Sequence, residues 1–480
     1  MNYKLVFSTV LKVVKLESAL MLLPLITSLI YKENCFYAFL LTMVIAFTLA
    51  HVIQLFIKPT SKHFYSKDGF LTVALTWIIV SIIGCVPFVI SGEIPSIVDA
   101  FFEMVSGFTT TGATILEDVE NLSKGILIWR SFSHFIGGMG VLVFIMAITS
   151  KTTDRPIHIL RAEMPGPMIS KLVPKSKDTA KILYLMYIVL TVTLAIFLLA
   201  GGMPLFDSLI HAFGTAGTGG FGILNSSIAE YNDFIQWVIA IFMLLFGINF
   251  NLYYLLIIKR TFSVLKSSEL RTYLLVILTA VIAIFINIYP LYQNVYQTIK
   301  YSSFQVVSII TTTGFGTADI SSWPAFSKMV LLSLMFIGGC SGSTAGGIKV
   351  SRFVLAIKKI KAELKKLLYP NTVSVIKFEG EKVEDDVLSG LSAYFTIYFI
   401  CFISLTLLVA LNGFDFETTF SAVCSCFNNI GPAFGQASSN FSCFNDFSKI
   451  VLSITMLLGR LEIYPLLLAF IPITWKKSKI

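Results

Sequence analysis

Four short stretches of the sequence combine small polar residues with glycine at matched spacing. The glycines are Gly112, Gly220, Gly314 and Gly431. Two residues before them come Thr110, Thr218, Thr312 and Asn429, and six residues before them come Ser106, Gly214, Ser308 and Ser425. Glycine can adopt a positive φ and so lets backbone carbonyls turn towards a common axis. Four such loops around one axis would form a ring of oxygens able to replace the hydration shell of a monovalent cation. The pattern therefore predicts ion binding by the backbone.

A second unusual stretch follows the third of these loops. It contains five glycines within ten residues, namely Gly338, Gly339, Gly342, Gly346 and Gly347. Each glycine costs about 1 kcal/mol in a helix interior relative to alanine, so a continuous helix is not expected. An unwound stretch at membrane depth should line a cavity. We interpret it as an intramembrane gate, and the alternative is a kink that allows tight helix packing. A phosphate-binding loop is not expected, because Ile348 separates Gly347 from Lys349 and breaks that motif.

One arginine, Arg460, falls about midway through the last apolar stretch. A charge at that depth is costly unless it is satisfied. Glu462 is two residues further on and would face away on a helix. We expect carbonyls of the glycine-rich stretch, or a carboxylate on another helix, as partners. The hypothesis is that Arg460 faces the pore and hinders cations when the gate is closed, and the alternative is a structural ion pair.

The elements that must position these residues are apolar helices. The chain has 480 residues, of which 56% are hydrophobic and 13% charged, and this excludes an ordinary soluble protein, a disordered chain and a nucleic-acid binder. Segments of about 20 apolar residues span a bilayer. Candidate spans lie near residues 16–31, 35–57, 69–91, 126–149, 182–203, 234–258, 272–293, 326–338, 389–411 and 447–475.

Most of the 36 Lys and Arg residues lie on alternate loops, counted from the N-terminal side, and acidic residues favour the opposite loops. The positive-inside rule then places both termini in the cytoplasm. The net charge of +9 is interpreted as a topological feature that also favours contact with anionic lipid of the bilayer. The five histidines and seven cysteines show no metal-ligand or catalytic spacing. Asp99 and Asp207 are expected at the N-termini of the first two short helices, where they would cap the helix, and the alternative is ion binding.

The predicted fold is an all-α polytopic membrane protein. Two N-terminal spans precede four repeats, each made of a span, a short re-entrant helix, a glycine-containing loop and a second span. The short helices have about 10–12 residues, too few to cross the membrane. The predicted units are 1–67 for the N-terminal helices, then 68–150, 151–265, 266–375 and 376–480 for the four repeats, the third with the glycine-rich loop.

The four loops resemble those of the Trk/Ktr/HKT potassium transporters. The resemblance rests on TTTGAT at 109–114, TGGFG at 218–222, TTTGFGTADISSWP at 311–324, FNNIGPAFG at 427–435, GGCSGSTAGGIKVSR at 338–352 and WRSFSHFIGGMG at 129–140. It covers nearly the whole chain, and the two extra N-terminal spans favour the TrkH-like branch. It implies four pseudo-fourfold potassium-channel-like repeats, and a potassium filter formed by the backbone of Thr110, Thr111, Gly112, Thr218, Gly219, Gly220, Thr312, Thr313, Gly314, Asn429, Ile430 and Gly431.

The resemblance further implies potassium uptake across the bacterial cytoplasmic (inner) membrane, with potassium as the transported ion, no organic cofactor on this chain and no enzyme activity. It implies a homodimer and a TrkA-like cytoplasmic ring that binds nucleotide. Residues 151–181 and 349–388 are candidate docking surfaces for that ring, or solvated linkers. Gly112, where sodium-transporting HKT members have serine, favours potassium. The fourth loop departs from the others at Ile430 and Pro432, so looser selectivity than in potassium channels is expected. The residues do not distinguish a channel-like pore from symport with protons or sodium.

Overall fold

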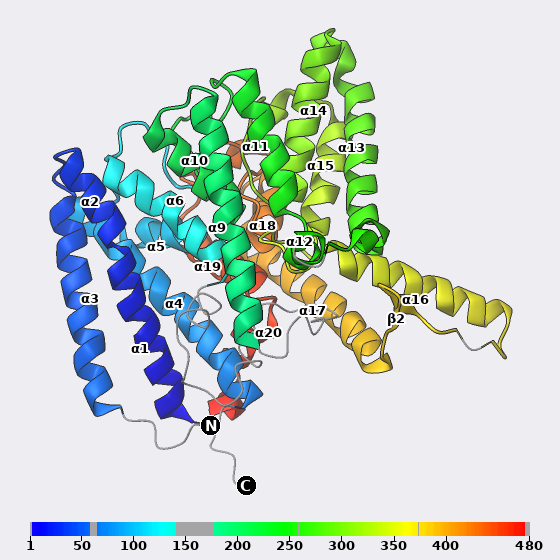
Figure 1. Ribbon diagram of the computed structural model, residues 1–480, viewed down its shortest axis with the longest axis horizontal. Helices are drawn as coiled ribbons and strands as arrows, with labels where there is room; N and C mark the ends of the chain where they lie inside the picture. Colours follow the sequence, from blue (N-terminus) through cyan, green and yellow to red (C-terminus); the bar gives the residue numbers. More distant parts are fainter. Residues whose placement is uncertain (1, 58–64, 141–175, 258–259, 373, 476–480) are drawn as a thin grey trace.

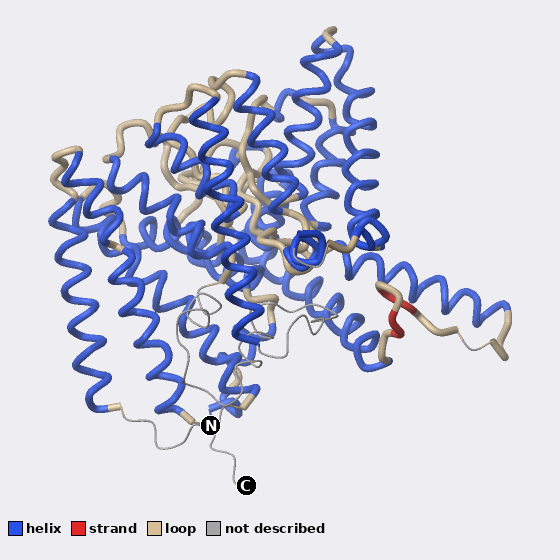
Figure 2. The backbone as a smooth tube through the Cα atoms, viewed as in Figure 1, coloured by secondary structure: helices blue, strands red, loops and turns tan. Residues whose placement is uncertain are grey.

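The described part of the chain is almost entirely helical. The computed structural model describes residues 2–57, 65–140, 176–257, 260–372 and 374–475. Figure 1 shows the helices gathered into one bundle, from which α16 (Val350–Leu368) projects to the right. In Figure 2 strand is confined to one short hairpin, formed by β1 (Lys377–Phe378) and β2 (Glu381–Lys382), which pair antiparallel. Residues 141–175 are not described, so the end of the expected 126–149 span and most of the 151–181 loop lie outside the described residues.

Three helices at the N-terminus stand at one side of the bundle (Figure 1). They are α1 (Tyr3–Leu20), α2 (Leu22–Ile30) and α3 (Phe36–Phe56). α1 and α2 together form a candidate membrane span of 28 residues, so the first span begins well before the expected residue 16. Within α1, Lys15 Nζ donates to Gln54 Oε1 on α3 at 2.5 Å.

The rest of the chain repeats one pattern of a long helix, a short helix, a loop and a second short helix. The long helices are α4 (Ser66–Ser91), α9 (Ser176–Ala200), α13 (Ser268–Tyr292) and α17 (Asp385–Ala410), with 25 or 26 residues each. The helices that precede the loops are α5 (Ile97–Phe108), α10 (Leu205–Gly217), α14 (Val295–Ile310) and α18 (Phe416–Asn428). The helices that follow them are α6 (Lys124–Gly138), α11 (Asp233–Phe246), α15 (Ala325–Ile337) and α19 (Asp446–Arg460).

The helices that follow the loops have 13 to 15 residues. α15 matches the expected span 326–338, whereas α11 and α19 are shorter than the spans expected there. The expected span 234–258 is bent by 92° between α11 and α12 (Phe250–Ile257). The expected span 447–475 is broken between α19 and α20 (Tyr464–Phe470). Within the described residues, six helices are long and apolar enough to cross a membrane, or seven if the bent pair counts as one. The expected spans 234–258 and 447–475 are therefore each interrupted, which the sequence analysis did not predict.

A glycine lies at or next to the end of each of these four helices. The glycines are Gly138, Gly247, Gly338 and Gly459. In all four places an added Cβ would overlap a neighbouring backbone atom or a buried tyrosine hydroxyl, as at Gly459 against the carbonyl of Phe427. Glycine is therefore needed where the chains approach closely. Shorter elements complete the chain: η1 (Phe262–Lys266), η2 (Ile320–Ser322), η3 (Gly435–Ala437) and η4 (Pro472–Trp475).

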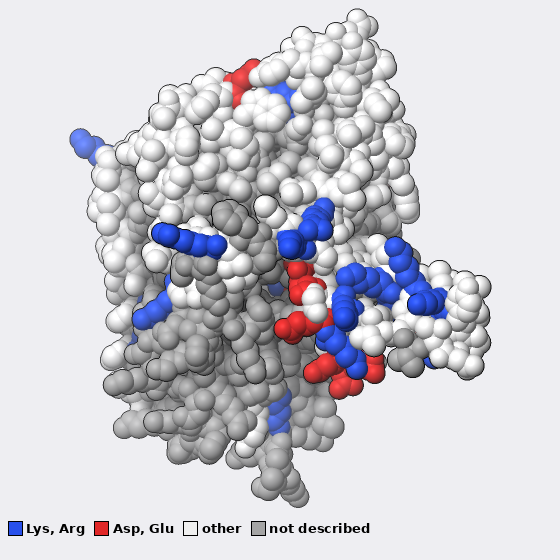
Figure 3. Space-filling view, turned by 45° about the vertical axis from the view of Figure 1, so that its right-hand side comes forward, with Lys and Arg blue, Asp and Glu red and all other residues white. Residues whose placement is uncertain are grey.

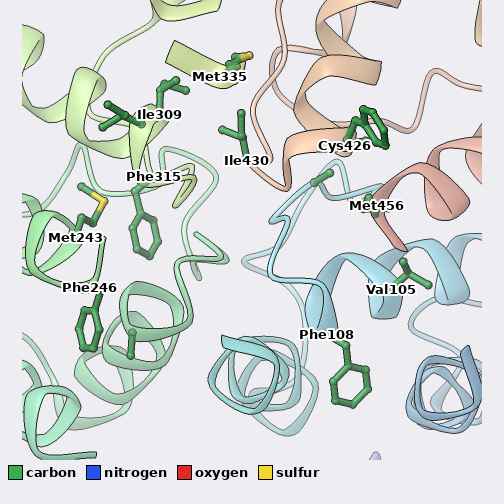
Figure 4. Close-up of a cluster of buried hydrophobic side chains, with 14 of the residues drawn as sticks. Val105, Phe108, Met243, Phe246, Ile309, Phe315, Met335, Cys426, Ile430 and Met456 are labelled. Carbon is green, nitrogen blue, oxygen red and sulfur yellow. The ribbon is translucent and has the colours of Figure 1, made fainter. Parts of the chain in front are cut away.

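The repeated units pack in a closed cycle. Each helix that follows a loop packs against the loop-preceding helix of the next unit: α6 against α10, α11 against α14, α15 against α18, and α19 against α5. The last contact joins the end of the chain to its first unit. One hydrophobic cluster runs through all four units, and Figure 4 shows part of it, with Phe108, Phe246, Ile309 and Met456 among its residues. On the outer helices many Leu, Ile and Phe side chains are exposed, as expected of surfaces that face lipid.

Candidate functional site

The four glycine loops share one unusual backbone conformation. The residues two before the glycines have positive φ values within a narrow range, with Thr110 at 55°, Thr218 at 54°, Thr312 at 54° and Asn429 at 56°. The glycines also have positive φ, with Gly112 at 78°, Gly220 at 77°, Gly314 at 88° and Gly431 at 103°. The residues between them, Thr111, Gly219, Thr313 and Ile430, do not. Because φ alternates in sign, successive carbonyls can turn to the same side of the chain instead of to opposite sides.

Each loop is fastened to its own helix by the same backbone hydrogen bond. The residue before the glycine donates its N–H to the carbonyl of the small residue six before the glycine. These bonds are Thr111 to Ser106 at 2.9 Å, Gly219 to Gly214 at 2.8 Å, Thr313 to Ser308 at 2.9 Å and Ile430 to Ser425 at 3.0 Å. The small residues six positions before the glycines thus lie where each loop folds back onto the end of its helix.

The four glycines lie against one another's loops in chain order. A Cβ built on Gly112 would overlap the carbonyl oxygen of Gly219, and one on Gly220 would overlap that of Thr313. A Cβ on Gly314 would overlap the carbonyl oxygen of Ile430, and one on Gly431 would lie 2.7 Å from that of Thr111. The loops therefore meet in a closed ring, and the space at each glycine is occupied by a carbonyl of the next loop.

The fourth loop lacks a hydroxyl before its glycine, and an amide takes over part of that role. In the first loop Thr109 Oγ1 and Thr111 Oγ1 lie 2.7 Å apart. In the fourth loop Asn429 Nδ2 donates to Thr111 Oγ1 at 2.9 Å and to the Met456 carbonyl at 3.0 Å. Asn429 therefore joins the fourth loop to the first and to α19.

The glycine-rich segment, residues 338–349, lies directly against the third loop. It is not helical between α15 and α16, and Gly338, Gly342 and Gly347 have positive φ. Gly346 donates its N–H to Thr312 Oγ1 at 2.6 Å. At its other side Cys340 N–H donates to the carbonyl of Gly247 at 3.0 Å, in the break between α11 and α12. Gly339 is packed against that same carbonyl.

A cavity of about 70 Å³ lies beside this segment. It is lined by Gly342, Gly346 and Gly347 of the segment, by Asn429 of the fourth loop, and by Arg460. Its volume is enough for several water molecules, each of which needs about 10–15 Å³ by this measure. The cavity thus lies between the fourth loop, Arg460 and the glycine-rich segment.

Arg460 is the last residue of α19, so its expected position midway through a span is wrong. Its guanidinium lies between the first loop and the glycine-rich segment. Nη1 donates to Thr110 Oγ1 at 3.0 Å and to the Thr344 carbonyl at 3.1 Å. Nη2 donates to the carbonyls of Gly137 at 2.5 Å and Gly138 at 2.8 Å, at the end of α6. Carbonyls of the glycine-rich segment were among the expected partners, and Thr344 supplies one.

Three charged residues near the glycine-rich segment were not singled out from the sequence as its supports. Glu462 pairs with Arg352 at the start of α16, and the Arg352 guanidinium lies 4.1 Å from the centre of the Tyr394 ring. Glu269 Oε1 accepts a hydrogen bond from Ser341 N–H at 2.7 Å. A charged residue within an otherwise apolar stretch is the sequence feature that indicates such a contact. It does not identify the partner, which lies far away in the sequence.

Asp99 and Asp207 lie in the first turns of α5 and α10, as expected, but neither is the N-cap. The N-cap of α5 is Ser96, whose side chain accepts from Asp99 N–H, and the N-cap of α10 is Pro204. Asp99 Oδ1 instead accepts from Lys449 Nζ on α19 at 2.6 Å. Asp207 Oδ2 accepts from the Tyr231 hydroxyl at 3.1 Å. Both carboxylates tie a loop-preceding helix to a neighbouring element.

The linkers beyond the first two loops are joined by one asparagine. Asn225 Oδ1 accepts from Val119 N–H at 3.0 Å, and Asn225 Nδ2 donates to Asp118 Oδ1 at 2.9 Å. The hydrogen bond from Asn225 is the largest cause that lowers the pKa of the Asp118 carboxyl. Asp118 therefore stays ionised at neutral pH and adds negative charge at this end of the molecule. The described residues contain no group of three or more His, Cys, Asp or Glu that could hold a metal ion.

Comparisons with known proteins agree on one family. The model of the family TrkH, described as a cation transport protein, matches residues 37–477. The Trk system potassium uptake protein TrkH of Salmonella typhimurium is 37% identical over 484 residues, which cover 99% of this chain and 100% of that protein. TrkI of Halomonas elongata is 31% identical over 95% of this chain and 94% of that protein. The crystal structure of the potassium transporter TrkH from Vibrio parahaemolyticus superposes with a TM-score of 0.89 and 32% identity, and covers 99% of this chain and 100% of that one.

Proposed function

The chain belongs to the TrkH family of cation transport proteins, and from this premise we propose that it takes up potassium through the ring formed by its four glycine loops. It is a membrane-type protein with several apolar helices. One observation supports the proposal above the others: the same alternation of φ recurs in all four loops, and the loops close into a ring. The relatives named above are potassium uptake proteins.

In this proposal the potassium ion is held by backbone carbonyls of the twelve residues of the four loops. A bare monovalent cation needs oxygens in place of its water shell, and carbonyl dipoles supply them without fixed charge. Close packing of the glycines against neighbouring carbonyls supports a narrow passage with little room for an ion to shift. The fourth loop, with Ile430 and Pro432 beside Gly431, makes the ring unequal, and we expect weaker selectivity than in a fourfold-symmetric channel filter.

The glycine-rich segment and Arg460 form the gate in this proposal. The segment contacts the third loop through Gly346 and the first loop indirectly through Arg460. A guanidinium beneath a ring of carbonyls repels an approaching cation. Opening would require the segment to move away and Arg460 to release its four carbonyl and hydroxyl acceptors.

The proposed orientation has both termini in the cytoplasm of a bacterium, with the chain in the inner membrane. Tyr3 and Trp475 support a common side, because their rings stack with centroids 6.5 Å apart. Figure 3 shows Lys and Arg side chains along the projecting α16, with Asp and Glu side chains gathered beside its base; the lysines in α16 are Lys358, Lys359, Lys361, Lys365 and Lys366. Such a basic surface fits the inner side of the membrane.

We also propose two assemblies, for which membership of the family is the only support. They are a homodimer and a complex with a nucleotide-binding cytoplasmic ring similar to TrkA. The basic α16 and its hairpin, within residues 349–388, are the surface we propose for the ring.

The deciding experiment is rubidium and sodium flux into proteoliposomes that contain the purified protein. Potassium uptake predicts rubidium flux that potassium blocks and that continues without sodium. Flux of sodium at the same rate as rubidium, or no cation flux with or without the cytoplasmic partner, would refute the proposal.

A further inference from the structure

A buried ion pair lies behind the first glycine loop. Glu103 on α5 and Arg130 on α6 are only 1% and 2% exposed. Arg130 Nε and Nη2 both donate to Glu103 Oε1, at 2.8 and 2.7 Å. Two charges so deeply buried are tolerated only when each is well paired and its remaining hydrogen-bonding positions are filled.

The Glu103 carboxylate holds the outer half of the first loop. Thr114 Oγ1 donates to its oxygens at 3.0 and 3.1 Å, and Ile115 N–H donates to Oε2 at 3.0 Å. Thr114 and Ile115 are the second and third residues after Gly112. The loop is therefore fixed on both sides of Gly112, by Ser106 before it and by Glu103 after it.

The Arg130 guanidinium extends the same contact to the second loop. Its central carbon lies 4.1 Å from the centre of the Phe221 ring, and Phe221 directly follows Gly220. A guanidinium at this distance over an aromatic face is attracted to it, most strongly away from water. The pair thus contacts two adjacent members of the ring.

The other three loops have different residues at the position of Glu103. Nine residues before the other glycines stand His211, Gln305 and Ala422. Gln305 Nε2 donates to the Ala318 carbonyl at 3.3 Å, His211 Nδ1 contacts the Asp207 carbonyl at 2.8 Å, and Ala422 has no polar side chain. The carboxylate at this position therefore belongs to the first loop, and the side chains at the matching positions of the other three loops make different contacts.

We propose that Glu103 and Arg130 are positioning residues that fix the first and second loops of the ring, so that the preference for potassium over sodium depends on their ion pair. Charge-assisted hydrogen bonds are shorter and stiffer than neutral ones, and a stiffly held loop cannot contract around the smaller sodium ion. This inference rests on the proposed function, because it assumes that the ring is the ion path.

The test is the ratio of rubidium to sodium flux in proteoliposomes for the Glu103→Gln variant. Glutamine keeps the size of the side chain and loses the charge, so the loop would be held by weaker bonds. We expect the ratio to fall about tenfold, as for loss of one charge-assisted hydrogen bond, while total cation flux is kept or rises. A role in stability alone would lower both fluxes together and leave the ratio unchanged.

Glu417→Gln is the matched control. Glu417 forms an ion pair with Lys328 at 3.2 Å, but its side chain is 48% exposed and lies on the loop-preceding helix of the fourth unit. The same substitution there should leave the ratio at the value of the unchanged protein, and a similar fall in the control would overturn the assignment to the buried pair.

A second variant covers the case in which Glu103→Gln does not fold. Thr114→Val removes one donor to Glu103 and leaves the ion pair intact, so a smaller fall in the ratio is expected, about threefold. An unchanged ratio in a folded variant of either kind overturns the inference. Failure of the proposed function is a separate outcome, because the unchanged protein itself would then show no preference for rubidium.

Discussion

The first and fourth glycine loops reach the same backbone conformation with different side chains. Thr110 and Asn429 have φ values of 55° and 56°. Behind the first loop stands the buried pair of Glu103 and Arg130, whereas Ala422 stands at the matching position behind the fourth. The fourth loop is held instead by the Asn429 amide and by Ser421 Oγ, which accepts from Phe434 N–H at 2.9 Å.

The difference teaches that the repeats preserve a backbone shape, and that each loop has its own way of keeping that shape. Gly431, at φ 103°, departs furthest from the other glycines, and it lies in the loop without the charged support. We therefore expect substitutions in the first loop to change the selectivity for potassium over sodium more than substitutions in the fourth loop.

The largest effect is expected from Gly112→Ser. The added Cβ would overlap the Gly219 carbonyl, and a positive φ costs a residue with a side chain roughly 1–2 kcal/mol. The ring must widen or shift, and permeability should move towards sodium by about tenfold or more, as for a change of roughly 1.4 kcal/mol between the two ions. Gly431→Ser, whose Cβ lies 2.7 Å from the Thr111 carbonyl, should have a smaller effect.

Gly222→Ser provides the control for both serine variants. An added Cβ at Gly222 meets nothing closer than 3.7 Å, so the potassium-to-sodium ratio should not change. The measurement is flux of rubidium and sodium in matched proteoliposomes. If Gly112→Ser keeps the ratio of the unchanged protein, the ring is not the selectivity filter.

The next largest effect is expected from Arg460→Ala, because Arg460 joins the first loop to the glycine-rich segment. Arg460 contacts Thr110 of the first loop and the Thr344 carbonyl of the segment, and its neighbour Gly459 packs against the Phe427 carbonyl near the end of α18. Loss of the guanidinium removes a cation from below the ring and frees the glycine-rich segment. Closed-state leak should rise about tenfold, as for loss of one or two hydrogen bonds from a charged group.

The Arg460→Lys variant keeps the positive charge but loses some of the hydrogen bonds that arginine forms. Its closed-state leak is measured in the same way, without the cytoplasmic partner. One ammonium cannot reach all four acceptors, so an intermediate leak is expected. A leak in Arg460→Ala equal to that of the unchanged protein would sink the proposed role of Arg460 in the gate.

A moderate effect is expected when the hydrogen bond between the first and fourth loops is removed. Thr111→Val and Asn429→Leu each remove one partner of the hydrogen bond between Asn429 Nδ2 and Thr111 Oγ1. Each should lower the free energy of unfolding by about 1–3 kcal/mol, the cost of a buried polar group left without its partner. Thermal unfolding of the single and double variants in detergent is the measurement, and strictly additive losses would show that the two residues do not interact.

The smallest effect concerns the caps of the two loop-preceding helices. Asp415 caps α18 and Ser96 caps α5. The hydrogen bond to Thr418 is the largest cause that lowers the pKa of Asp415 below its ordinary 3.8. Its ionised form therefore stabilises the fold above that pH, and the contribution is lost as the pH falls through the lowered value.

Asp415→Asn should match the unchanged protein at pH 7 and unfold at a higher temperature than it at pH 3, by a small margin because Asp415 is exposed to solvent. Ser96→Ala should cost about 1 kcal/mol at either pH, as is usual for a lost N-cap. The measurement is the unfolding temperature at the two pH values. Equal changes with pH in Asp415→Asn and in the unchanged protein would contradict the assigned role of Asp415.

Local features of the loops were open to prediction from the sequence. A helix end followed by a residue with positive φ and then by glycine is encoded within a few residues, so the alignment on Gly112, Gly220, Gly314 and Gly431 found the shared positions. The five glycines from Gly338 to Gly347 likewise pointed to an unwound segment. In both cases the physical cause, glycine at positive φ, lies in the residues themselves.

Features that depend on distant partners were not open to prediction in this way. Glu103 and Arg130 stand on separate helices, and although each is a charge within an apolar stretch, the sequence does not show that they pair. The break before α20 has no glycine at its sharpest point, since Ile463 itself has a φ of 71°, a conformation that a branched residue adopts only under constraint from its surroundings. For that reason the last span was expected to run through, and Arg460 was placed at its middle.

The four short helices have a consequence for how transport is driven. Helices of 13 to 15 residues reach only about 20–22 Å at 1.5 Å per residue, less than the roughly 30 Å of a bilayer core. A cavity lies beside Arg460. If the ring is the ion path, as proposed, and this cavity fills with water, the membrane voltage falls mainly across the ring. Each potassium ion would then gain about 2.3 kcal/mol per 100 mV within one narrow passage, and the electrical work of uptake would act where the four loops meet.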